Sequence, residues 1–398
     1  MSAKAAAVAQ PVRLASIDAY RGLVMLLMLG EVLHLCGVSE ALPNSGFWQL
    51  LCHHQSHVTW VGCALHDLIQ PSFSFLVGVA LPFSIASRVA KGSSTYGMFG
   101  HAVWRAFALV ALGIWLRSIG KSQTYFTFED TLTQIGLGYA FLFLIGLRSV
   151  KFQWIAFGVI VFSYWLLFAL WPLPGPNFDW SKAGVAADWS HHANGFAAHW
   201  NKNTNPAWVF DNWFLNLFPR AKPFQFSGDG YSTLSFIPTL GTMILGLLAG
   251  GWLKSELTAA QKIQRFIIAG VIGLAVGSLL NATGLCPNVK KIWTPAWVFF
   301  SGGWCFLFLA FFYALIDARN TKAWAFPLVV IGANSIFAYC AEWLFIGFIR
   351  RSLNTHLGED FFRLFGEPYR GLFQGACVLL IIWLLLLWLY RKKVFIRI

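Results

Sequence analysis

Charged residues are scarce in this sequence. Only 11% of the 398 residues are Asp, Glu, Lys or Arg, and 57% are hydrophobic, whereas a soluble domain carries roughly 25% charged residues. This composition excludes an ordinary soluble protein and indicates an integral membrane protein. The formal net charge of +13 is typical of Lys and Arg enrichment in cytoplasmic segments. No basic stripe is interleaved with aromatic residues, so we expect no nucleic acid partner.

Metal-ligand patterns are also lacking. The seven cysteines include no CxxC pair, which argues against a zinc site of that kind. Three imidazoles occur in the segment HHQSH at 53–57, but no carboxylate or Cys recurs at a ligand spacing such as HExxH. We therefore expect no metal. The N-terminal segment lacks an early apolar core with a cleavage site, so no removable signal peptide is expected.

Long apolar stretches are abundant. A helix needs about 20 apolar residues to cross a bilayer, and a helix satisfies its own backbone in lipid. We predict an all-α polytopic membrane protein in which residues 1–398 form a single transmembrane domain with about ten spans and a long extracytoplasmic loop at about 172–232. The spans are expected near 21–38, 62–87, 102–120, 131–147, 153–171, 233–253, 266–283, 295–316, 326–348 and 371–390.

The distribution of charge predicts the orientation. With a cytoplasmic N-terminus, more than half of the 29 Lys and Arg residues fall in cytoplasmic segments, as the positive-inside rule requires, and most of the 16 Asp and Glu residues fall outside. An even number of spans returns the basic C-terminal segment YRKKVFIRI to the cytoplasm. Both termini are therefore expected there.

Ionisable residues within spans mark the candidate site. Asp67 lies in the second predicted span and follows His57, which stands at its outer mouth. A carboxylate that orients an imidazole can produce a general base or a nucleophile. The alternative is structural, with Asp67 paired to an arginine or capping a neighbouring helix. Interfacial histidines are commonly solvated, and we expect His53 and His54 to be dispensable.

The first span carries two further polar pairs. Glu31 and His34, at positions i and i+3, share one face of its outer half, where they could meet Asp67 or form a structural ion pair. Asp18 and Arg21 have the same spacing at its cytoplasmic end, where an acid near a helix N-terminus is also a structural device.

Polar residues also mark later spans. Asp229 precedes the sixth span, Lys290 precedes the eighth, and Asn334 lies within the ninth. Lys290 could equally meet lipid headgroups, and Asn334 could simply join helices.

Two motifs resemble those of the heparan-α-glucosaminide N-acetyltransferase family and its shorter bacterial relatives. The first, R-L-x-S-x-D-x-x-R-G, is matched by Arg13, Leu14, Ser16, Asp18, Arg21 and Gly22. The second, H-x-x-W-x-G-x-x-x-x-D-L-x-x-P-x-F-x-F-x-x-G, is matched by His57, Trp60, Gly62, Asp67, Leu68, Pro71, Phe73, Phe75 and Gly78. The segments STLSFIPTLGTMILGLLAG, KKIWTPAWV and GANSIFAY are weaker matches.

The resemblance implies a membrane enzyme that transfers acetyl groups from cytoplasmic acetyl-CoA to the amine of a glucosamine on the far side. It implies His57 as a catalytic residue, and we expect Asp67 to be its catalytic partner. Because the phosphates of CoA need cations, we predict Arg13 and Arg21, together with Asp18, as donor-binding residues at the cytoplasmic side. For the acceptor we predict Glu31, His34, Trp60, Asp229, Lys290 and Asn334. Asn334 or a backbone amide near Gly62 could stabilise an oxyanion.

The chain also departs from the family pattern. Gln134 stands where relatives carry Arg, and an acidic motif near the sixth span is reduced to GDGYS. If those groups bind CoA phosphates or sugar, the donor or the acceptor differs here.

We therefore predict a multi-pass acetyltransferase of an inner membrane. The alternative is a transporter of a sugar or amino-sugar derivative, and a structural membrane protein is a third interpretation. The acceptor, the acyl chain length, the pairing of the cysteines and the association of identical chains stay open.

Overall fold

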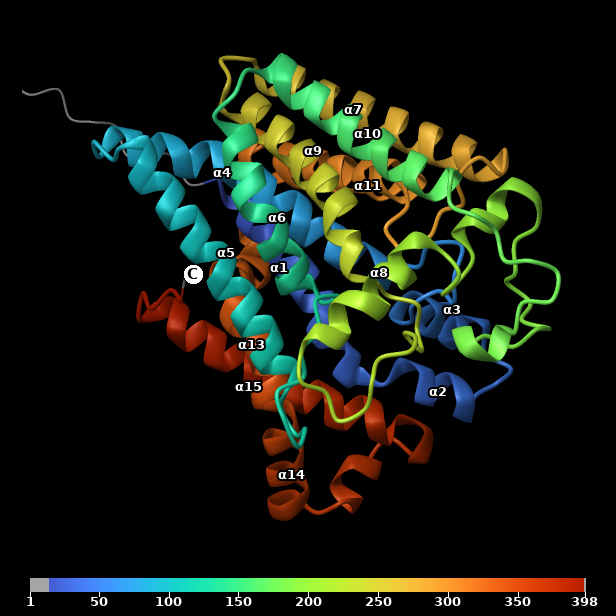
Figure 1. Ribbon diagram of the computed structural model, residues 1–398. Helices are drawn as coiled ribbons and strands as arrows, with labels where there is room; N and C mark the ends of the chain where they lie inside the picture. Colours follow the sequence, from blue (N-terminus) through green and yellow to red (C-terminus); the bar gives the residue numbers. More distant parts are fainter. Residues whose placement is uncertain (1–13, 397–398) are drawn as a thin grey trace, which may run out of the picture.

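The computed structural model describes residues 14–396 as helices joined by loops (Figure 1). An isolated antiparallel bridge joins Val61 to Val289. The predicted all-α polytopic fold is confirmed. The helices are α1 (Ala15–Leu29), α2 (Leu35–Ala41), α3 (Gly46–Gln55), α4 (Ile69–Ala90), α5 (Thr95–Arg117), α6 (Thr131–Gly146), α7 (Val150–Ala169), α8 (Pro206–Phe214), α9 (Phe236–Lys254), α10 (Ala259–Ala282), α11 (Pro295–Phe312), α12 (Phe326–Ala333), α13 (Ser335–Leu344), α14 (Ile346–Leu357) and α15 (Arg370–Arg391).

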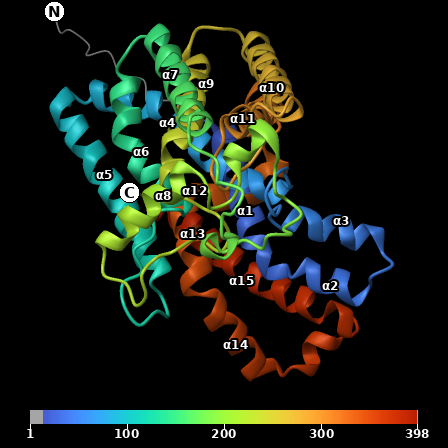
Figure 2. The same ribbon diagram turned by 45° about the vertical axis from the view of Figure 1, so that its right-hand side comes forward.

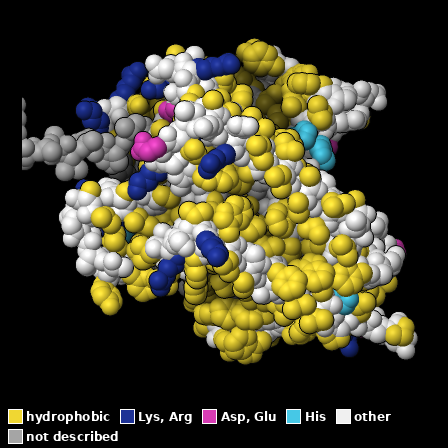
Figure 3. All heavy atoms as spheres, turned by 90° about the horizontal axis from the view of Figure 1, so that it is seen from above, with side chains coloured by type: hydrophobic (Ala, Val, Ile, Leu, Met, Phe, Trp, Pro, Cys, Tyr) yellow, Lys and Arg dark blue, Asp and Glu magenta, His cyan; other side chains and the backbone are white. Residues whose placement is uncertain are grey.

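The number of spans is slightly lower than predicted. Within residues 14–396, seven helices are long and apolar enough to cross a membrane, or up to nine if each of two bent pairs is one span. The remaining predicted span is α6, whose 16 residues fall short of the about 20 that a bilayer requires. Trp104, Phe107 and Ile272 are exposed, and Figure 3 shows a largely apolar face with Lys and Arg mainly toward its left side.

Two predicted spans are broken. Residues Ala15–Leu33 and Leu35–Ala41 meet at 41°, and Ala323–Ala333 and Ser335–Leu344 meet at 66°. The first break lies at His34, whose φ of +50° is left-handed, and the second lies at Asn334. Hydropathy cannot detect such breaks, because apolar residues flank both of them. Backbone groups freed by a break in a membrane need partners from elsewhere in the protein.

Close helix packing explains two glycines of the sequence motifs. Helix α4 packs along α9, and α1 packs along α12. Gly78 of α4 faces the carbonyl oxygen of Met243, and Gly22 of α1 faces that of Leu328, so neither position has room for a Cβ. Small residues allow such close backbone contact between membrane helices. The motifs therefore include packing positions as well as chemical groups.

The loop 172–232 gathers with α2 and α3 at one end of the helices, on the right of Figure 1, whereas α15 ends on the left. Trp60, Tyr164, Trp200 and Val289 form a second buried apolar cluster that holds this loop to the helix ends. Figure 2 shows α2 and α3 side by side, and a disulfide between Cys36 and Cys52 joins them. We refer to α2 and α3 together as the disulfide arm.

Candidate functional site

His57 lies on an irregular segment between α3 and the start of α4. Asp67 folds this segment back onto itself, because its Oδ2 accepts N–H groups from Ala64 at 2.9 Å and Val58 at 3.3 Å. The N–H of Gly62 donates to the carbonyl oxygen of Asn288 at 3.0 Å. These bonds explain how residues ten apart in the chain meet, and they make Asp67 a cap of its own helical segment rather than of a neighbouring helix.

Asp67, His57 and Lys290 form a compact triad. Asp67 Oδ1 lies 2.8 Å from His57 Nδ1 and 3.4 Å from Lys290 Nζ, and Lys290 Nζ lies 3.1 Å from His57 Nδ1. The side chains of Asp67 and Lys290 are only 1% and 5% exposed, whereas that of His57 is 40% exposed. A neutral His57 that donates Nδ1–H to the carboxylate keeps a lone pair on Nε2. Its accessible nitrogen is therefore equipped to act as a base or a nucleophile.

The surroundings favour the neutral form of His57. Burial lowers its pKa most, the hydrogen bond with Asp67 raises it, and the Lys290 ammonium lowers it again, with a net shift below the ordinary value. Burial lowers the pKa of Lys290 to about 8, although Asp67 opposes this shift. A buried lysine beside a buried carboxylate retains much of its charge at neutral pH. Lys290 thus balances Asp67 without protonating the imidazole.

Glu31 reaches the site through His66 rather than through His34. Its Oε1 lies 2.8 Å from His66 Nε2, and the rings of His66 and His57 are 4.6 Å apart. His34 lies elsewhere, because the helix breaks at this residue and the i, i+3 relationship is lost. Its Nε2 instead accepts a hydrogen bond of 2.7 Å from Arg350. The predicted Glu31–His34 pair is therefore wrong.

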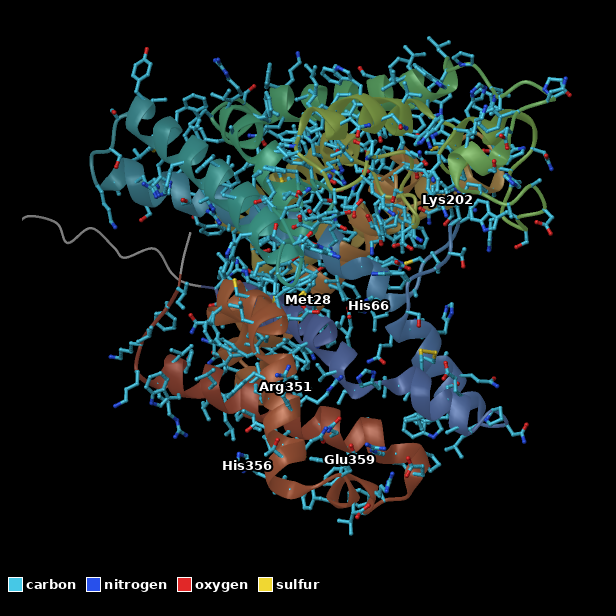
Figure 4. The ribbon with its side chains drawn as sticks, turned by 60° about the horizontal axis from the view of Figure 1, so that its bottom comes forward. Met28, His66, Lys202, Arg351, His356 and Glu359 are labelled. Carbon is cyan, nitrogen blue, oxygen red and sulfur yellow. A yellow bond between two sulfur atoms is a disulfide. The ribbon has the colours of Figure 1, made fainter. Side chains whose placement is uncertain are left out.

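A cavity of about 350 Å³ opens beside the triad, and we call it the outer cavity. Met28 and His66, both in its wall, lie near the middle of the molecule in Figure 4. Its charged lining is predominantly acidic, because it contains five carboxylate side chains and only two side chains of Lys or Arg. The lining includes His57, Glu31, Glu129, Asp130, Asp229, Glu342, Arg117, Lys290, Thr131, Tyr231 and Tyr339. Burial raises the pKa of Glu129 to about 7, partly offset by Arg117.

A second cavity of about 300 Å³ includes Asp18, at the other end of the first span, in its wall, and we call it the inner cavity. Asp18, Arg21 and Arg105 are among its lining residues, and it shares Thr131 and Tyr339 with the outer cavity. Glu31 and Asp18 lie at opposite ends of the first span, about 20 Å apart at about 1.5 Å of rise per residue. The two cavities therefore adjoin and together follow most of that span.

The structure brings most predicted site residues to these cavities, but not all. Trp60 is buried in the apolar cluster, where its Nε1 donates to the carbonyl oxygen of Trp200. Asn334 is buried and bonds to Val394 and Ile396, and it is absent from the lining of the outer cavity. Arg13 lies outside the described residues.

Several site residues were missed from the sequence. Arg117 and Glu129 precede α6 and line the outer cavity, and Arg105 lines the inner one. Glu342 had the same signal as Asp67, an acid within a predicted span, and could have been chosen by that rule. Gln134 donates to the carbonyl oxygens of Phe128 and Thr233, so it ties the chain before α6 to the start of α9.

Comparison with known proteins gives a distant relationship. The chain is 24% identical to human heparan-alpha-glucosaminide N-acetyltransferase over 97% of its own length. It is 22% identical to the mouse protein of the same name over 82% of its length. The alignments cover 60% and 53% of those proteins, so the chain spans little more than half of each. No family model matches the chain. In residues 14–396, no cluster of three or more His, Cys, Asp or Glu side chains could hold a metal ion.

Proposed function

We propose that this chain is a membrane acetyltransferase that moves the acetyl group of cytoplasmic acetyl-CoA to the amine of a glucosamine-type sugar at the opposite face. Its distant relatives carry an amino-sugar N-acetyltransferase name, which supports the reaction class. Because the chain spans only part of their length, the proposal rests chiefly on the site.

One observation carries the proposal: the two cavities share Thr131 and Tyr339. A transfer across a membrane requires a donor that enters on one side and a reactive group near the other. The inner cavity has Arg21 and Arg105 in its wall, and Arg suits phosphate recognition. The outer cavity has His57 in its wall. A long pantetheine arm in the shared passage would bring the thioester toward His57.

The triad supports two routes of acyl transfer. In the first, the acceptor ammonium releases one proton to solvent, His57 Nε2 takes a second proton as the amine nitrogen bonds to the thioester carbonyl carbon, and the C–S bond breaks. The thiolate then receives the proton from the imidazolium. In the second, Nε2 attacks the carbonyl and the CoA thiolate leaves. The amine, which has lost one proton to solvent, then takes the acetyl group from the imidazole and gives up a second proton, which neutralises the thiolate. In both routes Asp67 orients the ring and balances its positive charge.

Two of the oxyanion donors suggested by the sequence already have hydrogen-bond partners. The N–H of Gly62 bonds to Asn288, and the amide of Asn334 bonds to Val394 and Ile396. Arg117 and Tyr339 line the outer cavity, so we propose these side chains in their place. Such donors contribute strongly when they face the developing charge in a dry site.

The acidic lining of the outer cavity supports a cationic acceptor. Glu31 and Asp229, both predicted for this role, lie in its wall together with Glu129. Carboxylates attract an ammonium group and hold it until it is deprotonated. A neutral sugar could form hydrogen bonds with these carboxylates, but it would not gain the attraction between opposite charges. This distinction favours an amino sugar over the neutral sugars that a transporter could carry.

The disulfide arm supports the proposed orientation. Disulfides persist in oxidising compartments and are rare in the cytosol, and the Cys36–Cys52 bond lies in the segment that leads to His57. The charge distribution independently favours the same orientation, with this side away from the cytoplasm. We therefore propose that the outer cavity faces the extracytoplasmic side of an inner membrane and that both termini are cytoplasmic.

The test is acetyl transfer by the purified protein. Labelled acetyl-CoA and glucosamine should yield N-acetylglucosamine, and glucose should not accept the label. In sealed vesicles, a transporter would instead accumulate sugar without consuming acetyl-CoA. Uptake without transfer would overturn the proposal in favour of that alternative. A periplasmic reporter fused near Trp200 should be active and one after Ile398 inactive, and the reverse pattern would invert the orientation.

A further inference from the structure

The end of α15 turns the chain back toward the helix bundle. Lys393 has a left-handed φ of +57°, and the N–H of Val394 donates to the carbonyl oxygen of Leu389 at 3.0 Å while that of Lys393 donates to Tyr390 at 3.1 Å. This is the hydrogen-bond pattern of a helix ending in a Schellman motif. The reversal directs residues 394–396, which we call the tail, against the α12–α13 break.

Asn334 holds the tail at this break. Its Nδ2 donates to the carbonyl oxygen of Val394 at 3.0 Å, and its Oδ1 accepts the N–H of Ile396 at 3.0 Å. The side chain of Asn334 is fully buried, so it would carry an energetic penalty without these partners. The break and the tail therefore form one unit, and Asn334 joins them.

The tail forms part of the wall of the inner cavity. Ile396 lines it, together with Ser335 after the break and with Arg21 and Arg105 from other helices. The side chains of Lys392 and Lys393 are exposed and precede Ile396 by only a few residues. At about 3.3–3.6 Å per extended residue, both backbone positions lie within about 14 Å of the cavity wall. Two exposed cations therefore lie within this distance of the cavity.

Arg105 supplies a cation within the wall itself. Its Nη1 donates to the Tyr139 hydroxyl at 3.0 Å, and its guanidinium lies 4.7 Å from the Tyr139 ring centroid. These contacts hold the group without neutralising it, and its Nε has no hydrogen-bond partner. A phosphate would provide both the missing acceptor and a negative charge.

We propose that Arg105 and the Lys392–Lys393 pair bind the nucleotide phosphates of the donor, and that the tail held by Asn334 positions this pair at the rim of the inner cavity. This inference rests on the proposed function, because it assigns a subsite to its donor. It also places Asn334 in donor binding on the inner side, whereas the sequence suggested the acceptor or an oxyanion. The chemical class recognised is a phosphorylated nucleotide attached to a thioester arm.

The experiment compares two donors that differ in phosphate. Acetyl-CoA and acetyl-S-pantetheine carry the same thioester, but only the first carries the nucleotide. In full-length protein, Arg105→Gln and the double substitution Lys392→Ala/Lys393→Ala should each raise the KM for acetyl-CoA by about 10-fold or more, since hydrogen bonds to charged groups are the stronger ones. The KM for acetyl-S-pantetheine and for the sugar should stay within about 2-fold.

Two controls make the result decisive. Arg319→Ala/Lys322→Ala removes another exposed basic pair that is absent from the cavity lining, and should leave both donors unaffected. Equal changes for both donors, or no change for acetyl-CoA, would overturn the phosphate subsite. Titration calorimetry with CoA supplies a readout without turnover: the Lys392→Ala/Lys393→Ala protein should bind CoA more weakly than wild type. Wild-type protein that binds CoA in this way but transfers no acetyl group would contradict the proposed function and leave the subsite supported.

Discussion

At the scale of single residues, we propose His57 as the group on which the chemistry depends. We expect His57→Ala to lower kcat about 10²–10⁴-fold, as loss of a general base typically does, while the affinity for acetyl-CoA is retained. His53→Ala should stay within a few-fold of wild type and serves as the control. Turnover and binding are measured separately. Normal turnover by His57→Ala would show that the site is assigned incorrectly, and label retained on wild type but lost in His57→Ala would favour the acetyl-imidazole route.

The two neighbours of His57 should shift its titration in opposite directions. Lys290 lowers the pKa of His57 and Asp67 raises it. Lys290→Met should therefore raise the pKa of His57 and move the acidic limb of the kcat/KM profile to higher pH, because a higher pH is then needed to form the neutral imidazole. Asp67→Asn should move the limb to lower pH and reduce the rate less than His57→Ala does. Lys291→Met is the matched control. Shifts of the same sign in both variants would disprove this electrostatic account.

The sequence could predict part of this site. Asp67 can be predicted as a site residue because an acid within a membrane span is energetically costly and therefore marks a candidate site, and His57 stands at the mouth of the same span. Their contact with Lys290 cannot be predicted in this way. More than 200 residues separate Lys290 from His57, and only tertiary packing brings them together. Glu31 was chosen correctly as a residue near the site but paired with the wrong histidine. Helical spacing predicts neighbours only where the helix continues, and it ends at His34.

At the scale of elements, the disulfide arm should stabilise the segment that carries His57. Cys36 and Cys52 are 16 residues apart, and closing a loop of about 15 residues is worth about 3 kcal/mol in the chain-entropy account. We expect Cys36→Ser/Cys52→Ser to unfold at lower temperature in detergent and to lose turnover more than donor binding. Cys377→Ser, at a free thiol, is the control. Peptide mapping that finds Cys36 and Cys52 as free thiols would contradict the assignment and weaken the proposed orientation.

Element boundaries show what hydropathy can establish. The predicted spans correspond to apolar helices because a helix is one of the few structures that satisfy their own backbone hydrogen bonds within lipid. The breaks at His34 and Asn334 escaped detection, since they depend on partners far away in the sequence. Gln55 supplies those partners at the first break, where its side chain bonds to Leu35 N and Gly30 O. The tail supplies them at the second.

At the scale of the whole molecule, the break at Asn334 and the fold of α6 together shape the junction that we propose as a passage between the two cavities. Helix α6 begins with Asp130 as its cap, which accepts the N–H groups of Leu132 and Thr133. This places Thr131 at the junction of the two cavities. Tyr339, on α13 beyond the second break, lies at the same junction. A continuous α12–α13 helix would direct Tyr339 elsewhere, so the broken span is part of the proposed route between the membrane faces.

The passage itself can be tested at Thr131. The Asp130 cap does not use its side chain, so substitution there should leave the fold intact. We expect Thr131→Trp to fill the junction and lower acetyl transfer at least 100-fold, whereas CoA still binds to the inner cavity. Thr131→Val, which keeps the volume, should remain within a few-fold of wild type. Transfer rates and CoA affinity are measured side by side. If Thr131→Trp transfers acetyl groups normally, the thioester does not pass this junction, and the donor must reach His57 from the outer side.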